Sequence, residues 1–157
     1  MSPPVVADTG GLLRGLARTR DGKPSFPDYE RVLTSASLII VPGLVLAEVD
    51  YFLRDNRTTM RKVVAEIFDP GTRYEYERPL PEDLIRGLEF DAKFSDLNLG
   101  LVDGTVAAVA ERRQVYRILT TDRRAPARRG ADRESLPRCS GPGAHVASPD
   151  APTGARG

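Results

Sequence analysis

The chain has few of the residues from which disulfides, zinc sites and membrane spans are built. Its 157 residues include a single cysteine, Cys139, which excludes an internal disulfide and a zinc site made of several cysteines. No basic segment followed by a long apolar run opens the sequence, so no signal peptide is expected. The longest apolar stretch, residues 38–47, is too short for a membrane span. These absences predict a soluble, cytoplasmic protein with no membrane partner.

An excess of charge of one sign is absent as well. The 23 basic and 22 acidic residues give a net charge of +1, which argues against a polycation that works mainly by binding nucleic acid. The charge is uneven, however, because residues 1–122 carry −3 and residues 123–157 carry +4. The second segment is rich in Pro, Gly, Ala and Arg, and its only large aliphatic residues are Leu136 and Val146. We therefore expect a folded domain over residues 4–124 and a disordered tail over residues 125–157.

Strand and helix patterns alternate along the first 122 residues. Short apolar or alternating runs predict strands over residues 5–7, 37–42, 74–77 and 115–120. Apolar residues at helical spacing predict helices over residues 12–17, 29–37, 44–53, 58–68, 81–96 and 101–113. Strands separated by helices predict an α/β fold with a central, mostly parallel sheet and helices on both faces.

Two acidic residues directly follow predicted strands. Asp8 ends the first strand and Asp122 ends the fourth. Functional sites of open parallel sheets lie at the carboxyl ends of the strands, so both carboxylates are candidates. The alternative for each is a helix cap or a turn carboxylate, which is common after strands.

Two further acidic residues lie on predicted helices. Glu48 is flanked one turn away on each side by Leu44 and Phe52, and a lone carboxylate in such an apolar stripe must be paired, coordinated or neutralised. The alternative is that Glu48 lies at the edge of the stripe and reaches solvent. Asp103 lies near the start of a helix rich in Ala and Val. It is a candidate for the same site, or else it simply stabilises the helix N-terminus.

Four carboxylates at one edge of a sheet would repel each other and therefore require a cation. Ligands that are all oxygen suit Mg²⁺ or, as a substitute, Mn²⁺. No histidine or cysteine competes for this role, because His145 and Cys139 both lie in the tail. A metal held in this way activates water and stabilises charge on a phosphodiester, which is the chemistry of a nuclease.

Five segments together resemble one known family in their order and spacing. They are residues 5–9 (VVADT), 46–49 (LAEV), 101–105 (LVDGT), 108–112 (AVAER) and 118–122 (ILTTD). The chain resembles PIN-domain ribonucleases, specifically VapC-type toxins of toxin–antitoxin pairs. The resemblance implies a PIN-like fold, a Mg²⁺-dependent endoribonuclease acting on a structured RNA, a homodimer, and neutralisation by a VapB-type antitoxin. It also implies that Asp8 and Asp103 are the principal metal ligands and that Glu48 and Asp122 complete the acidic pocket.

The sequence departs from this family after Arg124. The family commonly continues into a last edge strand, whereas no strand pattern is recognisable in residues 125–157. We therefore expect an unpaired edge beside the fourth strand. An alternative function follows, in which a catalytically impaired PIN domain retains only antitoxin binding. A separate alternative is that the Asp8-Thr9-Gly10 triplet belongs to an aspartic protease, but those enzymes are all-β and pair two such carboxylates.

The sequence also suggests where partners bind. Apolar residues within 45–53 and 63–68 exceed the needs of one small sheet face, so part of this surface is expected to form a groove for an antitoxin segment. The basic residues Arg14, Arg18, Arg20 and Lys23 are candidates for contacts with RNA phosphates. The alternative for them is a solvated helix face.

Overall fold

The computed structural model describes residues 2–121 and, as backbone, residues 145–147. Asp122 and the rest of the tail lie outside the described residues. The described residues form, in order, β1 (Val5–Ala7), α1 (Thr9–Leu16), α2 (Pro27–Ser35), β2 (Ile39–Pro42), α3 (Gly43–Phe52), α4 (Arg57–Phe68), β3 (Tyr74–Glu77), α5 (Pro81–Lys93), the 3-10 turn η1 (Ser95–Leu97), α6 (Gly100–Arg112), β4 (Ile118–Thr120) and β5 (His145–Ala147). The types of these elements confirm the strands and helices predicted for residues 5–120.

The sheet has the strand order β3-β2-β1-β4-β5, and its first four strands are parallel. Short β1 is central, because Val6 pairs with both Ile40 of β2 and Ile118 of β4. All three residues of β1 are fully buried. A strand buried on both faces reads as a continuous apolar run, which is why Val-Val-Ala without alternation forms the middle of the sheet.

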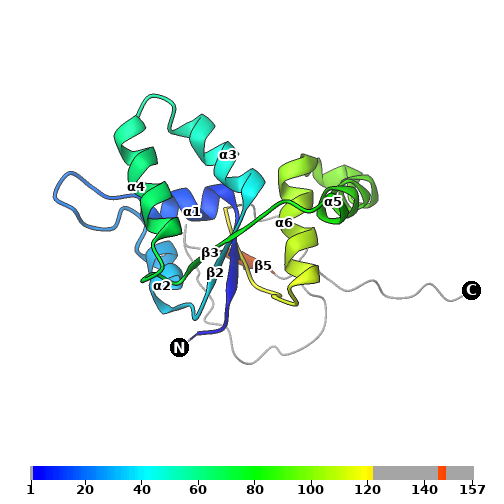
Figure 1. Ribbon diagram of the computed structural model, residues 1–157, viewed down its shortest axis with the longest axis horizontal. Helices are drawn as coiled ribbons and strands as arrows, with labels where there is room; N and C mark the ends of the chain where they lie inside the picture. Colours follow the sequence, from blue (N-terminus) through cyan, green and yellow to red (C-terminus); the bar gives the residue numbers. More distant parts are fainter. Residues whose placement is uncertain (1, 122–144, 148–157) are drawn as a thin grey trace, which may run out of the picture.

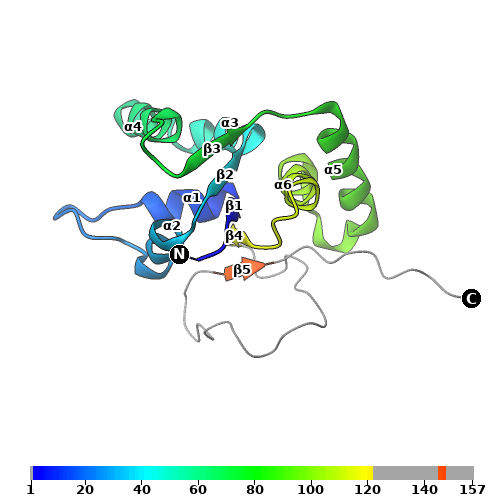
Figure 2. The ribbon, with the colours of Figure 1, turned by 60° about the horizontal axis from the view of Figure 1, so that its bottom comes forward.

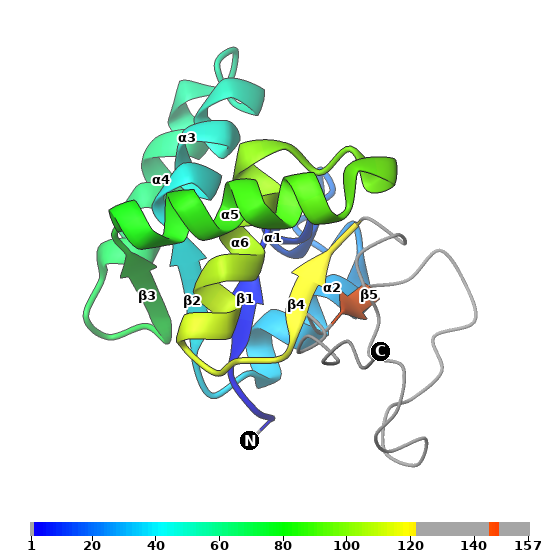
Figure 3. The same ribbon diagram turned by 90° about the vertical axis from the view of Figure 1, so that its right-hand side faces the viewer.

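Helices cover both faces of the sheet, as predicted (Figures 1 and 2). Helices α1, α2 and α4 lie on one side, and α5 and α6 lie on the other. The core joins the strands to apolar faces of these helices, including Leu12, Leu33, Ile67 and Val109. Because α6 connects to the parallel strand β4 through a short loop, it runs antiparallel to the strands, and its first turn lies at their carboxyl ends (Figure 3).

One expectation about the tail is wrong. Strand β5 pairs antiparallel with β4, with Leu119 opposite Val146, so the edge of β4 is not unpaired there (Figure 2). A three-residue edge strand is held by backbone hydrogen bonds and needs no apolar run of its own. Composition therefore did not signal it. The expectation of disorder for the other residues of 125–157 falls outside the described residues.

A network of carboxylates and arginines ties β3 to α5 and α6. Arg112 donates two hydrogen bonds of 2.8 and 2.9 Å to Asp83 and a third of 2.9 Å to Glu77. Arg113 pairs with Glu75 and with Glu77. Glu75 and Glu77 share one face of β3 because side chains alternate along a strand. The network thereby anchors the C-terminal end of α6 at the β3 edge of the sheet.

No helix in the described part of the chain is both long and apolar enough to cross a membrane.

Candidate active site

Asp8 lies directly after β1, at the carboxyl end of the central strand. It is the N-cap of α1, and its Oδ1 accepts a 2.6 Å hydrogen bond from the N–H of Gly11. The residue is 9% exposed. The capping interpretation is thus confirmed, and it is compatible with a site role because the cap holds the carboxylate in a fixed orientation at the strand end.

Two glycines bring the start of α1 against the end of β4. A Cβ on Gly11 would lie 2.1 Å from the Leu119 carbonyl oxygen, and a Cβ on Gly10 would lie 2.3 Å from Oγ1 of Thr121. Only glycine allows this approach. It sets Thr121, the residue before Asp122, next to the turn that begins with Asp8. Hydrophobic periodicity in the sequence does not predict this contact. Its one sign in the sequence is the glycine pair that follows Asp8 and Thr9.

Asp103 lies in the first turn of α6 and is exposed to solvent. Helix α6 packs against β1 and β2, which puts its N-terminal turn beside the end of β1. Behind Asp103, a Cβ on Gly104 would lie 2.3 Å from the carbonyl oxygen of Gly87, so α5 and α6 are in backbone contact there. The helix that carries Asp103 is thereby packed between the sheet on one side and α5 on the other.

Glu48 does not lie in a buried stripe, contrary to the argument from sequence. The buried residues of α3 are Val45 and Val49, whereas Glu48 is half-buried and Phe52 is largely exposed. Both faces of this helix carry apolar residues, and tertiary packing buries the face that carries Val45 and Val49. The alternative, in which Glu48 reaches solvent, describes its position. Helix α3 packs against both α1 and α6, the helices that carry the other two described acids.

A buried hydroxyl group lies next to Asp8. Oγ1 of Thr9 is buried and has no hydrogen-bond partner among the described residues. A buried hydroxyl without a partner is costly, so this group suits polar surroundings that a bound ion with its waters would complete. Oγ1 of Thr105 is also buried without a partner among the described residues, but it faces α5, because a Cβ on Gly87 would lie 3.0 Å from it, and it belongs to the contact between α5 and α6.

The arrangement fits a magnesium ion held by few protein ligands. Within residues 2–121 and 145–147, no three His, Cys, Asp or Glu side chains are grouped closely enough to hold a metal. Mg²⁺ does not require such a group, because it usually keeps several waters and binds through one or two carboxylates. Asp8 and Asp103 supply carboxylate oxygens of the right kind. The position of Asp122 relative to them lies outside the described residues.

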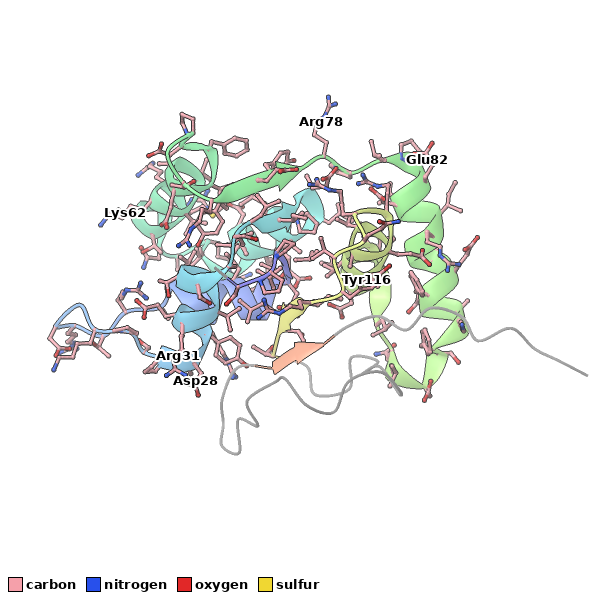
Figure 4. The ribbon with its side chains drawn as sticks, turned by 90° about the horizontal axis from the view of Figure 1, so that it is seen from below. Asp28, Arg31, Lys62, Arg78, Glu82 and Tyr116 are labelled. Carbon is pink, nitrogen blue, oxygen red and sulfur yellow. The ribbon has the colours of Figure 1, made fainter. Side chains whose placement is uncertain are left out.

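Three of the four basic residues near α1 have partners of their own, whereas Arg20 is exposed and has no ion pair within the described residues. Arg14 lies 5.0 Å from the ring centroid of Phe26, Arg18 pairs with Glu30 at 3.3 Å, and Lys23 pairs with Asp21 at 3.4 Å. These contacts favour the solvated-face alternative over phosphate binding at this position. A comparable surface pair, Arg31 with Asp28, lies on α2 at 3.1 Å (Figure 4).

Comparison with known proteins assigns the family. The model of the PIN domain matches residues 5–131, which span every described element except β5. The chain belongs to the PIN-domain family. Among solved structures, this PIN domain is similar to VapC20 of Mycobacterium tuberculosis, a toxin that cleaves the sarcin-ricin loop. The TM-score is 0.60 at 17% sequence identity, over 76% of this chain and 91% of VapC20. A search of curated protein sequences finds no match.

A groove of about 280 Å³ lies at the other end of the PIN domain, between α1, α2 and α4. Its lining includes the apolar residues Leu16, Leu33 and Ile39. It also includes four charged residues: Arg18 just after α1, Glu30 of α2, Glu66 of α4 and Arg73 just before β3. Burial and the nearby Glu66 raise the pKa of Tyr74, which also lines it. The groove predicted for residues 45–53 and 63–68 stays a prediction: most valines and Ile67 of those segments belong to the core, whereas Tyr51, Phe52 and Phe68 are exposed.

Proposed function

We propose that this PIN domain is a Mg²⁺-dependent endoribonuclease that acts as the toxin of a toxin–antitoxin pair. The observation that carries the proposal is the match of the PIN-domain model to residues 5–131. The packing of α3, which carries Glu48, against α1 and α6, which follow Asp8 and carry Asp103, supports it, and α1 and α3 begin at carboxyl ends of parallel strands. The match of the PIN-domain model and the structural similarity to a VapC toxin support the same activity.

In this proposal Asp8 and Asp103 hold the metal, and Glu48 and Asp122 complete the acidic pocket. Mn²⁺ is expected to substitute for Mg²⁺. When bound, the ion supplies an activated water and charge stabilisation for phosphodiester hydrolysis. Asp8 contributes a carboxylate whose orientation is fixed by Gly11 N–H, and Asp103 contributes one that is open to solvent and hence to a substrate phosphate.

The substrate that we propose is a structured RNA in the cytoplasm, and the partners are an antitoxin of the VapB type and a second copy of the chain. The groove between α1, α2 and α4 has a lining of apolar and charged residues that suits an antitoxin segment. The alternative of an impaired domain that only binds antitoxin rested on a missing edge strand. Because β5 pairs with β4, we favour the active enzyme.

The test is cleavage of a panel of structured RNAs by the purified full chain. Activity is expected with Mg²⁺ and is expected to vanish in excess EDTA. Asp103→Asn should lose most activity while keeping its circular dichroism spectrum and melting temperature. An equally exposed control, Asp96→Asn, should cleave as the wild type does. Full cleavage in EDTA, or full activity of Asp103→Asn, would contradict the proposed site.

A further inference from the structure

Helix α3 ends in two aromatic side chains that the fold leaves uncovered. Tyr51 and Phe52 are each 60% exposed, and their rings meet edge to face with centroids 5.7 Å apart. The guanidinium of Arg54 lies over the Tyr51 ring, 4.7 Å from its centroid. Two neighbouring aromatic rings in water are a cost to a monomer and a ready surface for a ligand with a flat π face.

Positive charge gathers around this pair. Residues 51–62 contain four basic side chains, Arg54, Arg57, Arg61 and Lys62, against one acid, Asp55. Arg57 is neutralised by Asp50 at 2.7 Å, and Arg54 lies 3.9 Å from the exposed Asp55. Arg61 and Lys62 have no ion pair within the described part of the chain, and Lys62 projects outward from α4 (Figure 4). In a protein whose net charge is only +1, this is a local basic surface suited to a polyanion.

The aromatic pair also lies on the same side of the molecule as the candidate active site. Helix α3 starts at the carboxyl end of β2 and rises beyond the edge of the sheet, and its C-terminal end forms the far tip with the turn to α4 (Figures 1 and 3). Glu48 precedes Phe52 by one helical turn, a rise of about 6 Å along the axis. A strand of RNA at the acidic residues would therefore pass the tip of α3.

We propose that Tyr51 and Phe52 are a platform on which one unpaired base of the RNA substrate stacks beside the cleavage site. Arg54, Arg61 and Lys62 then bind the flanking phosphates. This inference rests on the proposed ribonuclease function and adds that the substrate segment is single-stranded or looped. Bases stack on aromatic rings and on guanidinium planes without sequence preference, so the platform positions RNA without reading the base.

An RNA base suits this surface better than a protein partner does. The core of a protein interface is a continuous apolar area from which charge is depleted. Here Arg54 lies over one of the two rings, and the apolar residues of α3 that are buried, Val45 and Val49, belong to the core of the fold. Small apolar area together with several arginines is the composition of a surface that binds single strands.

The test compares RNA binding by substitution variants in an Asp103→Asn background, so that RNA is bound without being cut. The probe is an RNA hairpin that the wild type cleaves, with 2-aminopurine in its loop. Tyr51→Ala and Phe52→Ala should each bind about 5- to 150-fold more weakly, the range for loss of one stacked base. Tyr51→Phe should bind normally and Tyr51→Leu weakly, because stacking needs the ring and not its apolar volume. Quenching of 2-aminopurine fluorescence should be lost with the same variants.

Phe68→Ala is the matched control, since Phe68 is 55% exposed at the other end of α4. It should bind the hairpin as the parent does. Equal hairpin binding by Tyr51→Ala, Phe52→Ala and the parent would overturn the platform while leaving the ribonuclease intact. Loss of antitoxin binding alone in these variants would overturn it too and assign the surface to the protein partner. No RNA cleavage by the wild type would instead refute the proposed function.

Discussion

The contact between Gly10 and Thr121 is open to a double-mutant cycle. In Gly10→Ala the new Cβ would lie 2.3 Å from Oγ1, 2.9 Å from Cγ2 and 3.2 Å from Cβ of Thr121. Overpacking of this kind costs about 1–3 kcal/mol. Replacing a helical glycine with alanine also stabilises the fold by up to about 1 kcal/mol, because the unfolded chain then has less conformational freedom to lose on folding. The single variant should therefore be destabilised by about 0–3 kcal/mol.

The partner substitution removes the clash. Thr121→Ala deletes the two atoms of residue 121 that lie nearest to the new methyl group, and by itself it should cost about 1 kcal/mol or less for a half-buried side chain. The double variant should consequently be more stable than the sum of the singles by about 1–3 kcal/mol. Cleavage of RNA should follow the same order, because the clash moves the residue that precedes Asp122.

The control lies one residue further along α1. In Gly11→Ala the new Cβ would lie 2.1 Å from the Leu119 carbonyl oxygen, which is backbone and cannot turn away. This variant should lose more stability than Gly10→Ala, and Thr121→Ala should not rescue it. Urea unfolding followed by circular dichroism measures the wild type and all five variants. A coupling energy below about 0.5 kcal/mol between residues 10 and 121, or rescue of Gly11→Ala, would refute the close approach of α1 to β4.

Three further outcomes are expected. Asp8→Asn should lose RNA cleavage yet still fold, because an Asn side chain also caps a helix; cleavage assays beside thermal melting check both, and wild-type activity would count against the site. Asp83→Ala should cost about 2 kcal/mol in urea unfolding, less than a fully buried pair, because Asp83 is 2% exposed but Arg112 33%; an unchanged midpoint would show that the pair contributes nothing. Hydrogen bonds from Arg86 lower the pKa of Glu111 below its usual 4.5, so the stabilisation is present above pH 4.5 and is lost as the pH falls further. Glu111→Gln should thus be less stable than wild type at pH 7 by under about 1 kcal/mol, and a difference that persists in acid would contradict this cause.

Local patterns along the sequence predicted the elements well, because each pattern reports which face of a segment is buried. Residues 74–77 alternate and form β3 with the predicted bounds, and the apolar run 5–7 forms β1. The helix predicted over 81–96 ends instead at Lys93 and is followed by η1, where Asn98 and Gly100 take positive φ angles of 49° and 75°. No signal of helical period marks such a left-handed break.

Contacts between distant segments were beyond the reach of the same patterns. The bond from Arg112 to Glu77 joins residues 35 apart, and a charged residue on a helix gives no sign of its partner. Glu48 was assigned to a buried stripe because both faces of α3 carry apolar residues, and only the packing of Val45 and Val49 distinguishes them. The strand at 145–147 was missed because backbone pairing needs no side-chain pattern.

The central position of β1 has a consequence for when the protein can become active during its synthesis. The first strand to leave the ribosome pairs with β4, which is the last of the parallel strands to be made. The N–H of Asp8 itself donates a 3.0 Å hydrogen bond to the Leu119 carbonyl oxygen. Until β4 has been made, a nascent chain therefore lacks both the complete parallel sheet and the contact that positions Asp8. A PIN domain built in this order positions Asp8 only when nearly the whole domain has emerged, so the proposed nuclease activity is withheld from the nascent chain.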